Sequence, residues 1–141
     1  KAIELHQLVK KVAALLEYKA ADAHIQFGFH FQGESFIIQA DEQQLEQALI
    51  NILKNAMEAI GNHGQITIAT DPGRKLLTIT DSGTGISKAH TVHLFRPFFS
   101  TKKDGQGVGL TLVKEILLNH EFQFSLKTVA IGKTVFTIEF K

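Results

Sequence analysis

The segment DSGTGIS, residues 81–87, places an acid and two glycines directly after the hydrophobic strand pattern LLTIT. A simple turn needs one glycine, so the pair Gly83 and Gly85 indicates a place where the backbone comes close to another group. The ionised carboxylate of Asp81 can only accept hydrogen bonds. This pattern therefore predicts a site for a group that donates a hydrogen bond.

A second set of polar residues lies in QALINILKNAMEAI, residues 47–60, where Asn51, Asn55 and Glu58 fall on one side of a helix. An ordinary solvent-exposed helix face, with no ligand, would show the same stripe of polar residues. Asparagine, however, is a poor helix former, and an amide oxygen suits a hard cation such as Mg²⁺ that also holds phosphate oxygens and water. Both interpretations stay open from the spacing alone.

A third segment, DGQGVGL at residues 104–110, carries Gly105, Gly107 and Gly109 at the expected start of a helix. Free N–H groups and the helix dipole at such a start attract phosphate. A flexible loop before a helix would have the same composition. The dinucleotide-binding pattern is excluded because no hydrophobic strand leads directly into these glycines.

Hydrophobic periodicity indicates the elements that position these residues. We expect an amphipathic helix from Leu5 to Leu16, a helix from about residue 42 to Ile60 and a helix from Val108 to Asn119. Asp41 and Gly61 are the expected caps of the second helix. Strands are predicted at 25–31 and 36–38, as a hairpin, and at 65–70, 75–80, 122–126 and from Thr134 onward. Residues 88–107 lack a period and predict a long loop.

The bulk composition predicts one domain, residues 1–141, because 44% hydrophobic residues in a chain of this length can form one core. A net charge of +1 gives no reason to expect binding to nucleic acid or direct contact with a membrane. Cysteine is absent, which excludes disulfides and thiolate metal sites. The chain starts at Lys1 inside a helical pattern, so we expect it to be part of a longer protein.

Four motifs in order resemble the N, G1, F and G2 boxes of the catalytic ATP-binding domain of sensor histidine kinases: INILKNA (50–56), DSGTG (81–85), LFRPFFSTK (94–102) and GQGVGL (105–110). This family shares a superfamily with gyrase, Hsp90 and MutL. The resemblance covers essentially the whole chain. The expected fold is an α/β (α+β) two-layer sandwich of the Bergerat type, a mixed, mainly antiparallel sheet of about five strands with three main helices on one face.

The resemblance also implies a role for each motif. Asp81 would accept a hydrogen bond from the adenine amino group, with Gly83 and Gly85 passing close to the base. Asn55 would bind Mg²⁺ with Asn51 as a helper, and Asn55 and Lys102 would act in catalysis. ATP would also contact Lys102, Gly105, Gly107, Gly109 and Leu110, under a flexible lid at about 86–107. We interpret Phe95, Phe98 and Phe99 as packing at the base of that lid.

This sequence departs from the family pattern at several positions. Glu58 stands where many relatives have a phosphate-binding lysine, Arg96 replaces a frequent acid, and Glu121 replaces a glycine at a turn outside the nucleotide site. Asn51 stands where gyrase, Hsp90 and MutL have the glutamate that activates water. An amide cannot take a proton, which favours phosphoryl transfer to a histidine, a nucleophile that needs no general base.

No histidine of the chain lies in an acceptor motif; His120 alone is followed by an acid, and no proline comes after it. The resemblance therefore implies a two-component sensor kinase in which this cytoplasmic domain uses ATP and Mg²⁺ to phosphorylate a histidine on a separate dimerisation and phosphoacceptor domain, from which a response regulator receives the phosphate. Two alternatives are a serine kinase or ATPase of the same superfamily and a non-catalytic nucleotide-binding or docking module.

Overall fold

The computed structural model describes residues 1–83, 107–130 and 133–141. Its elements, in chain order, are β1 (Ala2–Glu4), α1 (Leu5–Asp22), β2 (Ile25–Phe31), β3 (Ile37–Gln39), α2 (Glu42–Ile60), β4 (Gly64–Asp71), β5 (Leu76–Asp81), α4 (Gly107–Asn119), β6 (Gln123–Ala130) and β7 (Lys133–Glu139). The loop and lid expected before Gly107 lie outside the described residues.

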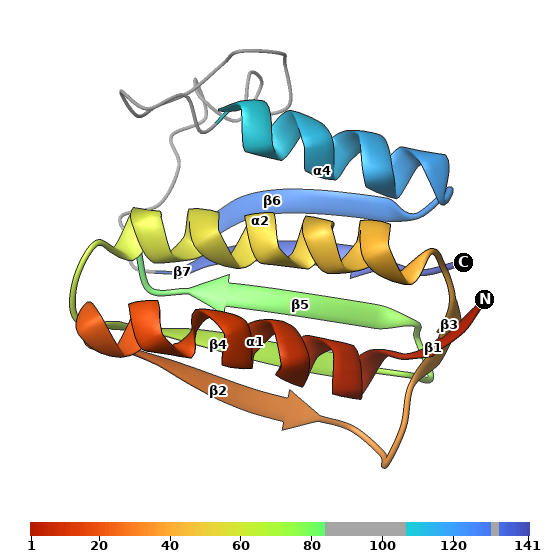
Figure 1. Cartoon of the computed structure of the whole chain (residues 1–141), viewed down its shortest axis with the longest axis horizontal. Helices are drawn as coiled ribbons and strands as arrows, with labels where there is room; N and C mark the ends of the chain where they lie inside the picture. The colour runs from red at the N-terminus through yellow and green to blue at the C-terminus, as the bar shows by residue number, and fades with distance from the viewer. Residues whose placement is uncertain (84–106, 131–132) are drawn as a thin grey trace.

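The main sheet has five strands in the order β2-β4-β5-β7-β6. Strands β2 and β4 are parallel, and the other neighbours are antiparallel. Helices α1, α2 and α4 lie side by side on one face of this sheet (Figure 1). The predicted two-layer architecture with a mixed, mainly antiparallel sheet is confirmed.

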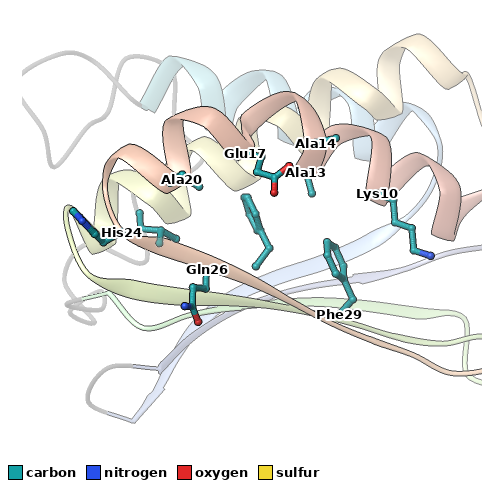
Figure 2. Close-up of a pocket in the computed structure, with 11 residues that line it drawn as sticks. Lys10, Ala13, Ala14, Glu17, Ala20, His24, Gln26 and Phe29 are labelled. Carbon is teal, nitrogen blue, oxygen red and sulfur yellow. The ribbon is translucent and has the colours of Figure 1, made fainter.

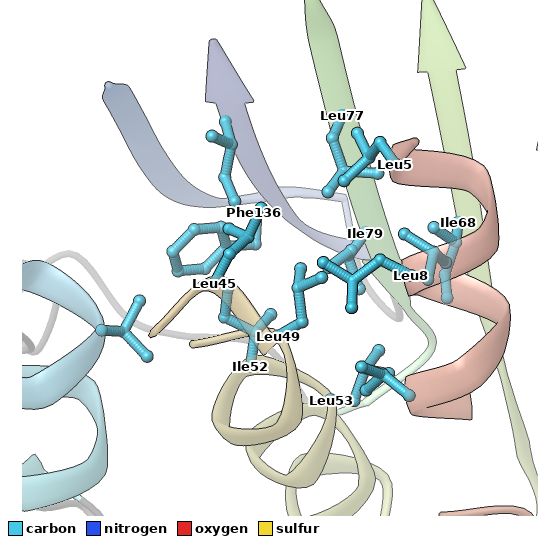
Figure 3. Close-up of a cluster of buried hydrophobic side chains, with 14 of the residues drawn as sticks. Leu5, Leu8, Leu45, Leu49, Ile52, Leu53, Ile68, Leu77, Ile79 and Phe136 are labelled. Atoms are coloured by element: carbon cyan, nitrogen blue, oxygen red, sulfur yellow. The ribbon is translucent and has the colours of Figure 1, made fainter. Parts of the chain in front are cut away.

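The core fills the space between the helices and the covered face of the sheet (Figure 3). Strands β4, β5 and β7 alternate buried and more exposed residues, so each strand turns one row of side chains toward the helices. The largest fully buried side chains come from α1, α2, β4, β5, α4 and β7: Leu5, Leu45, Leu49, Leu53, Ile66, Ile68, Leu77, Leu117 and Ile138 among them. The apolar residues at helical spacing and those that alternate along the strands thus meet in one core.

The predicted hairpin of residues 25–31 and 36–38 is wrong. Strand β2 pairs in parallel with β4, and β3 pairs with β1 in a separate two-stranded sheet. Parallel strands require a crossover connection, which α2 supplies between β2 and β4. Gly33 follows β2 with φ 73°, and the chain after it leads to β3, which pairs with β1 instead of returning along β2.

Helix α2 has the ends that its sequence predicts. The side chain of Asp41 accepts a hydrogen bond from the Gln44 N–H at 2.9 Å, and the helix ends before Gly61, which has φ 76°. The backbone N–H of Asp41 donates to Nε2 of His120 at 3.0 Å, so Nδ1 of that ring carries the proton and donates to the Ile116 carbonyl at 2.8 Å. His120 therefore links the start of α2 to the last turn of α4.

Glu121 follows as a turn residue in left-handed backbone, with φ 61°. Glycine is favoured in this region, which is the physical reason for a glycine at such a turn. Glu121 forms an ion pair with Lys141, and the hydrogen bond and charge of that lysine lower the pKa of its carboxyl. The departure from glycine is thus accommodated at the surface.

Glu4 joins the first strand to the rest of the domain. One carboxylate oxygen accepts from the backbone N–H of His6 at 2.9 Å, as an N-cap of α1, and from the N–H of Phe36 at 3.0 Å. Burial opposes ionisation of the carboxyl, but the hydrogen bonds from Phe36 and His6 outweigh it, so the pKa of Glu4 lies below its ordinary value.

Glu4→Gln should destabilise the domain at neutral pH by about 1 kcal/mol, because the neutral amide is a weaker acceptor for two backbone donors. A lowered folded-state pKa stabilises the fold above the unfolded pKa and loses that contribution as pH falls through the folded value. The difference between variant and parent in urea unfolding should therefore shrink from pH 7 to pH 3.5. The control is Glu34→Gln, at an exposed residue two positions before Phe36. A loss of stability in Glu4→Gln that does not change with pH would contradict this account.

Candidate functional site

Asp81 is the last residue of β5 and is 7% exposed. It lies between Ile66 of β4 and Thr134 of β7 in the sheet register. Its Oδ1 accepts a hydrogen bond from the backbone N–H of Gly83 at 2.9 Å. This contact fixes the orientation of the carboxylate at the end of the strand, as a specific acceptor requires.

Gly83 follows at a point where the chain touches helix α2. A Cβ at this position would lie 2.8–2.9 Å from the carbonyl carbon, Cβ and oxygen of Ala59, distances that real side chains do not adopt. Gly83 is also buried. The close approach that the two glycines predict is therefore present at Gly83, and its partner among the described residues is the last turn of α2.

Ser82 fixes the same segment to β4. The Ser82 N–H donates to the Gln65 carbonyl at 3.2 Å, and the Gln65 N–H donates to the Ser82 hydroxyl at 3.0 Å. These two hydrogen bonds continue the pairing of β4 with β5 for one residue beyond Asp81. The backbone on both sides of Asp81 is thus held by neighbouring elements.

Asn55 lies on α2, one turn before the contact between Ala59 and Gly83. Its Nδ2 donates to the backbone carbonyl of Asn51 at 2.8 Å. Because a carbonyl oxygen can only accept, this bond identifies which side of the amide faces the helix and leaves Oδ1 as the atom for a ligand. Asn55 and Asn51 are partly buried, and Glu58 on the next turn is exposed.

The Asn51 side chain contacts a residue one turn earlier. Gln47 Nε2 donates to Asn51 Oδ1 at 3.1 Å. None of Asn51, Asn55 and Glu58 belongs to the buried face of α2, so the predicted polar stripe is separate from that face. The side-chain amide of Asn51 is held by Gln47.

Helix α4 lies beside α2 (Figure 1) and packs against it. It begins at Gly107, one residue before the predicted start, and Leu110 in its first turn is buried. Four predicted site residues or ranges lie outside the described residues: Gly85, Lys102, Gly105 and the lid before Gly107. The F-box residues Phe95, Arg96, Phe98 and Phe99 lie outside them as well.

The structure thus brings the Asp81 turn and the Asn55 helix together through the contact of Gly83 with Ala59. Sequence reasoning missed Ala59, Ser82 and Gln47. Only their positions near Asp81, Asn55 and Asn51 could have indicated them. Ala59 is a small residue one turn after Asn55, as a close approach requires, but alanine is common in helices. Within the described residues, no group of three or more His, Asp, Glu or Cys could hold a metal ion. The described part of the chain therefore offers a cation at Asn55 no such cluster, and phosphates and water are the ligands that Mg²⁺ commonly keeps.

Comparison with known proteins identifies the domain. Residues 40–141 match the family model described as histidine kinase-, DNA gyrase B-, and HSP90-like ATPase. The chain is 36% identical over 140 residues to sensor histidine kinase ZraS of Salmonella typhi, and the aligned region covers 97% of this chain and 30% of that protein. It is 31% identical over 141 residues to sporulation kinase C of Bacillus subtilis, covering 98% of this chain and 33% of that protein.

Among solved structures, the catalytic domain of histidine kinase ThkA matches with a TM-score of 0.87 and 29% identity, over 98% of this chain and 92% of that one. The chain belongs to the histidine kinase-, DNA gyrase B- and HSP90-like ATPase family. Within it, the chain is an ATP-binding kinase domain of the histidine kinase type. It spans about a third of the length of these two curated relatives. None of the described helices is both long and apolar enough to cross a membrane.

Gly83→Ala should destabilise the domain, because the new methyl group would overlap backbone atoms of Ala59 that cannot rotate away. Overpacking of this kind costs about 1–3 kcal/mol, measured as a lower urea midpoint with an unchanged slope. Gly73→Ala is the matched control, since its added Cβ would meet only Asp71 Oδ1 at 3.5 Å. Equal stability of the Gly83→Ala variant and the parent would contradict the assigned contact.

Proposed function

We propose that this domain binds Mg-ATP and transfers the γ-phosphoryl group to a histidine on a separate dimerisation and acceptor domain of a two-component sensor kinase. The observation that carries the proposal is the buried Asp81 carboxylate, oriented by the Gly83 N–H at the end of β5, in a chain of this family. Family membership supports ATP as the ligand. The local geometry supports the roles of individual residues.

Asp81 is proposed to recognise adenine. The exocyclic amine of adenine donates hydrogen bonds, and an ionised carboxylate accepts them without competing donors of its own. Its low exposure removes competing water, which strengthens such a bond. Gly83 and Gly85 are proposed to keep the adjoining backbone free of side chains near the base.

Asn55 is proposed to hold Mg²⁺ through Oδ1, because its Nδ2 is already committed to the Asn51 carbonyl. A neutral oxygen ligand fits a cation that keeps several waters and takes its remaining ligands from phosphates. Asn51 is proposed as a helper at the same ion. When bound, the ion would neutralise charge on the phosphates during transfer. Lys102, with Gly105, Gly107, Gly109 and Leu110, is proposed to contact the triphosphate.

The chemistry follows from the absence of a base at Asn51. A neutral imidazole nitrogen of the acceptor attacks the γ-phosphorus, the bond to the β-γ bridging oxygen breaks, and ADP leaves with that electron pair. The acceptor nitrogen needs no deprotonation before attack, so Asn51 can be an amide. Asn55 and Lys102 then act by positioning and neutralising charge.

A second candidate is hydrolysis in the ATPase branch of the family. The observation that favours it is Glu58, an exposed carboxylate on the helical turn after Asn55. A docking module without catalysis is the remaining alternative. The fixed orientation of both Asp81 and Asn55 supports the catalytic proposal instead.

A response regulator is the proposed receiver of the phosphate. Histidine kinase ThkA has been solved in complex with the response regulator TrrA, and that kinase is 27% identical to this chain with a TM-score of 0.83. We place this domain in the cytoplasm, where ATP is available, as part of a longer protein.

Asp81→Asn should weaken ADP and ATP binding by roughly ten- to a hundredfold, because a hydrogen bond to a charged acceptor is worth about 1.5–3 kcal/mol. Titration calorimetry with ADP measures the change. Asp71→Asn is the matched control, since Asp71 ends the neighbouring strand β4, where it accepts from the Arg74 N–H instead. Unchanged ADP affinity in folded Asp81→Asn protein would remove Asp81 from the site.

The isolated chain should bind ATP yet neither hydrolyse it appreciably nor label itself. With the acceptor domain added, γ-labelled ATP should give label on one histidine outside residues 1–141, and Asn55→Ala should abolish it. Phosphohistidine is lost in acid, whereas phosphoserine is stable. Acid-stable label on this chain would support the serine-kinase alternative, and brisk phosphate release abolished by Glu58→Gln would support the ATPase.

A further inference from the structure

The two outer strands of the main sheet differ in how they are protected. Strand β6 carries exposed Lys127 and a register irregularity between Thr128 and Ala130, both of which hinder pairing with another strand. Strand β2, IQFGFHF, has no Lys, Arg, Asp, Glu or Pro and pairs regularly with β4 along all seven residues. Of the two outer strands of the main sheet, β2 is thus the one open to strand addition.

A groove of about 690 Å³ lies between this edge and helix α1 (Figure 2). Small residues line its helical side, Ala13, Ala14, Ala20 and Ala21, and Phe27 and Phe29 line its strand side. Phe29 is 40% exposed. The lining of the groove is therefore mainly apolar, with Lys10 and Glu17 also part of it, and the groove has room for side chains of an added strand.

The sequence of β2 is nearly symmetric about Gly28. In an antiparallel pair of two β2 strands centred on Gly28, each Phe27 lies opposite the partner's Phe29, and each Ile25 opposite the partner's Phe31. These apolar residues share the face toward α1, by the alternation of a strand. Gln26 lies opposite the partner's His30 on the other face. Apolar residues thus meet apolar ones, and polar residues meet polar ones, at every position.

Helix α1 has a matching symmetry above the strand. The midpoint between Ala13 and Ala14 is equally distant in sequence from Lys10 and Glu17, and all four line the groove. Figure 2 shows Lys10 and Glu17 on opposite sides of the two alanines. A two-fold axis near this midpoint brings each Lys10 toward the partner's Glu17. Within the part of the chain that is described, neither residue has an ion-pair partner, and Lys10 Nζ lies over the Phe31 ring of β2, 5.7 Å from its centroid.

We propose that this chain forms a two-fold symmetric dimer in which two β2 edges pair in antiparallel fashion about Gly28 and join the two five-stranded sheets. The partner's Phe29 enters the groove under α1, and two symmetric pairs of Lys10 with Glu17 close its rim. A second copy is the occupant because the strand complements itself about Gly28 and the helix complements itself about the midpoint of Ala13 and Ala14. Such self-complementarity is what a two-fold interface requires.

This dimer surface is separate from the proposed nucleotide site. Helix α4 lies at the opposite edge of the helical layer from α1, with α2 between them (Figure 1). Pairing through β2 therefore leaves α4 and its contact with α2 uncovered. The proposal consequently does not depend on the chemistry proposed for Asp81 and Asn55.

Sedimentation of the chain over a range of concentrations should show a monomer–dimer equilibrium. Phe29→Lys should raise the dimer dissociation constant at least about tenfold, because it places a charge in the paired edge and in the apolar groove. The matched control is Tyr18→Lys, on an 85% exposed α1 residue that does not line the groove. Circular dichroism checks that both variants keep the fold.

A charge exchange tests the register. Glu17→Lys alone sets like charges against each other and should weaken the dimer several-fold, whereas the double variant Lys10→Glu with Glu17→Lys should restore it to within about twofold of the parent. A chain that stays monomeric to about 1 mM, which includes the case of a different protein as occupant, would overturn the proposal. So would a dimer that Phe29→Lys does not weaken, or one that the double charge exchange fails to restore.

Discussion

The close contact between Gly83 and Ala59 is the constraint on which the site depends. It presses the turn after β5 against the last turn of α2, where no side chain fits. The Gly83 N–H is the same group that orients Asp81. One glycine therefore fixes both the Asp81 carboxylate and its place relative to the helix that carries Asn55. The two proposed site residues are thus positioned by the core and not by a flexible loop.

The opposite end of α2 is fixed by different chemistry. The Asp41 N–H donates to His120, and His120 donates to Ile116, so the first residue before α2 is bonded to the last turn of α4. With 19 residues, α2 is a rod of about 28 Å. Hydrogen bonds hold α4 against one end of this rod and packing holds the Asp81 turn against the other, which makes α2 the common reference for both sides of the proposed nucleotide site.

The parts of the structure that local chemistry determines could be predicted from the sequence. Asp41 and Gly61 set the bounds of α2, and the acid before Gly83 and the asparagines at helical spacing indicated the residues of the proposed site. The pairing of β2 could not be predicted, because it depends on a parallel partner more than thirty residues away. Strand β1 has three residues, too few to show a period. Ala59 was equally invisible, since only tertiary packing distinguishes it from any other helical alanine.

The strand order also accounts for the separation between the β2 edge and the proposed nucleotide site at the end of β5. Antiparallel neighbours surround β5, so Asp81 is flanked on both sides by strands and its surroundings are fixed by β4 and β7. Strand β2 joins the sheet only through β4, by way of the crossover helix α2, and its outer side has no partner strand among the described residues. An uncharged outer strand is a liability in a monomer, because exposed N–H and C=O groups invite pairing. In the proposed dimer, the symmetric sequence of β2 lets this edge pair specifically with a second copy of itself. That contact lies at the side of the sheet where no proposed catalytic residue lies.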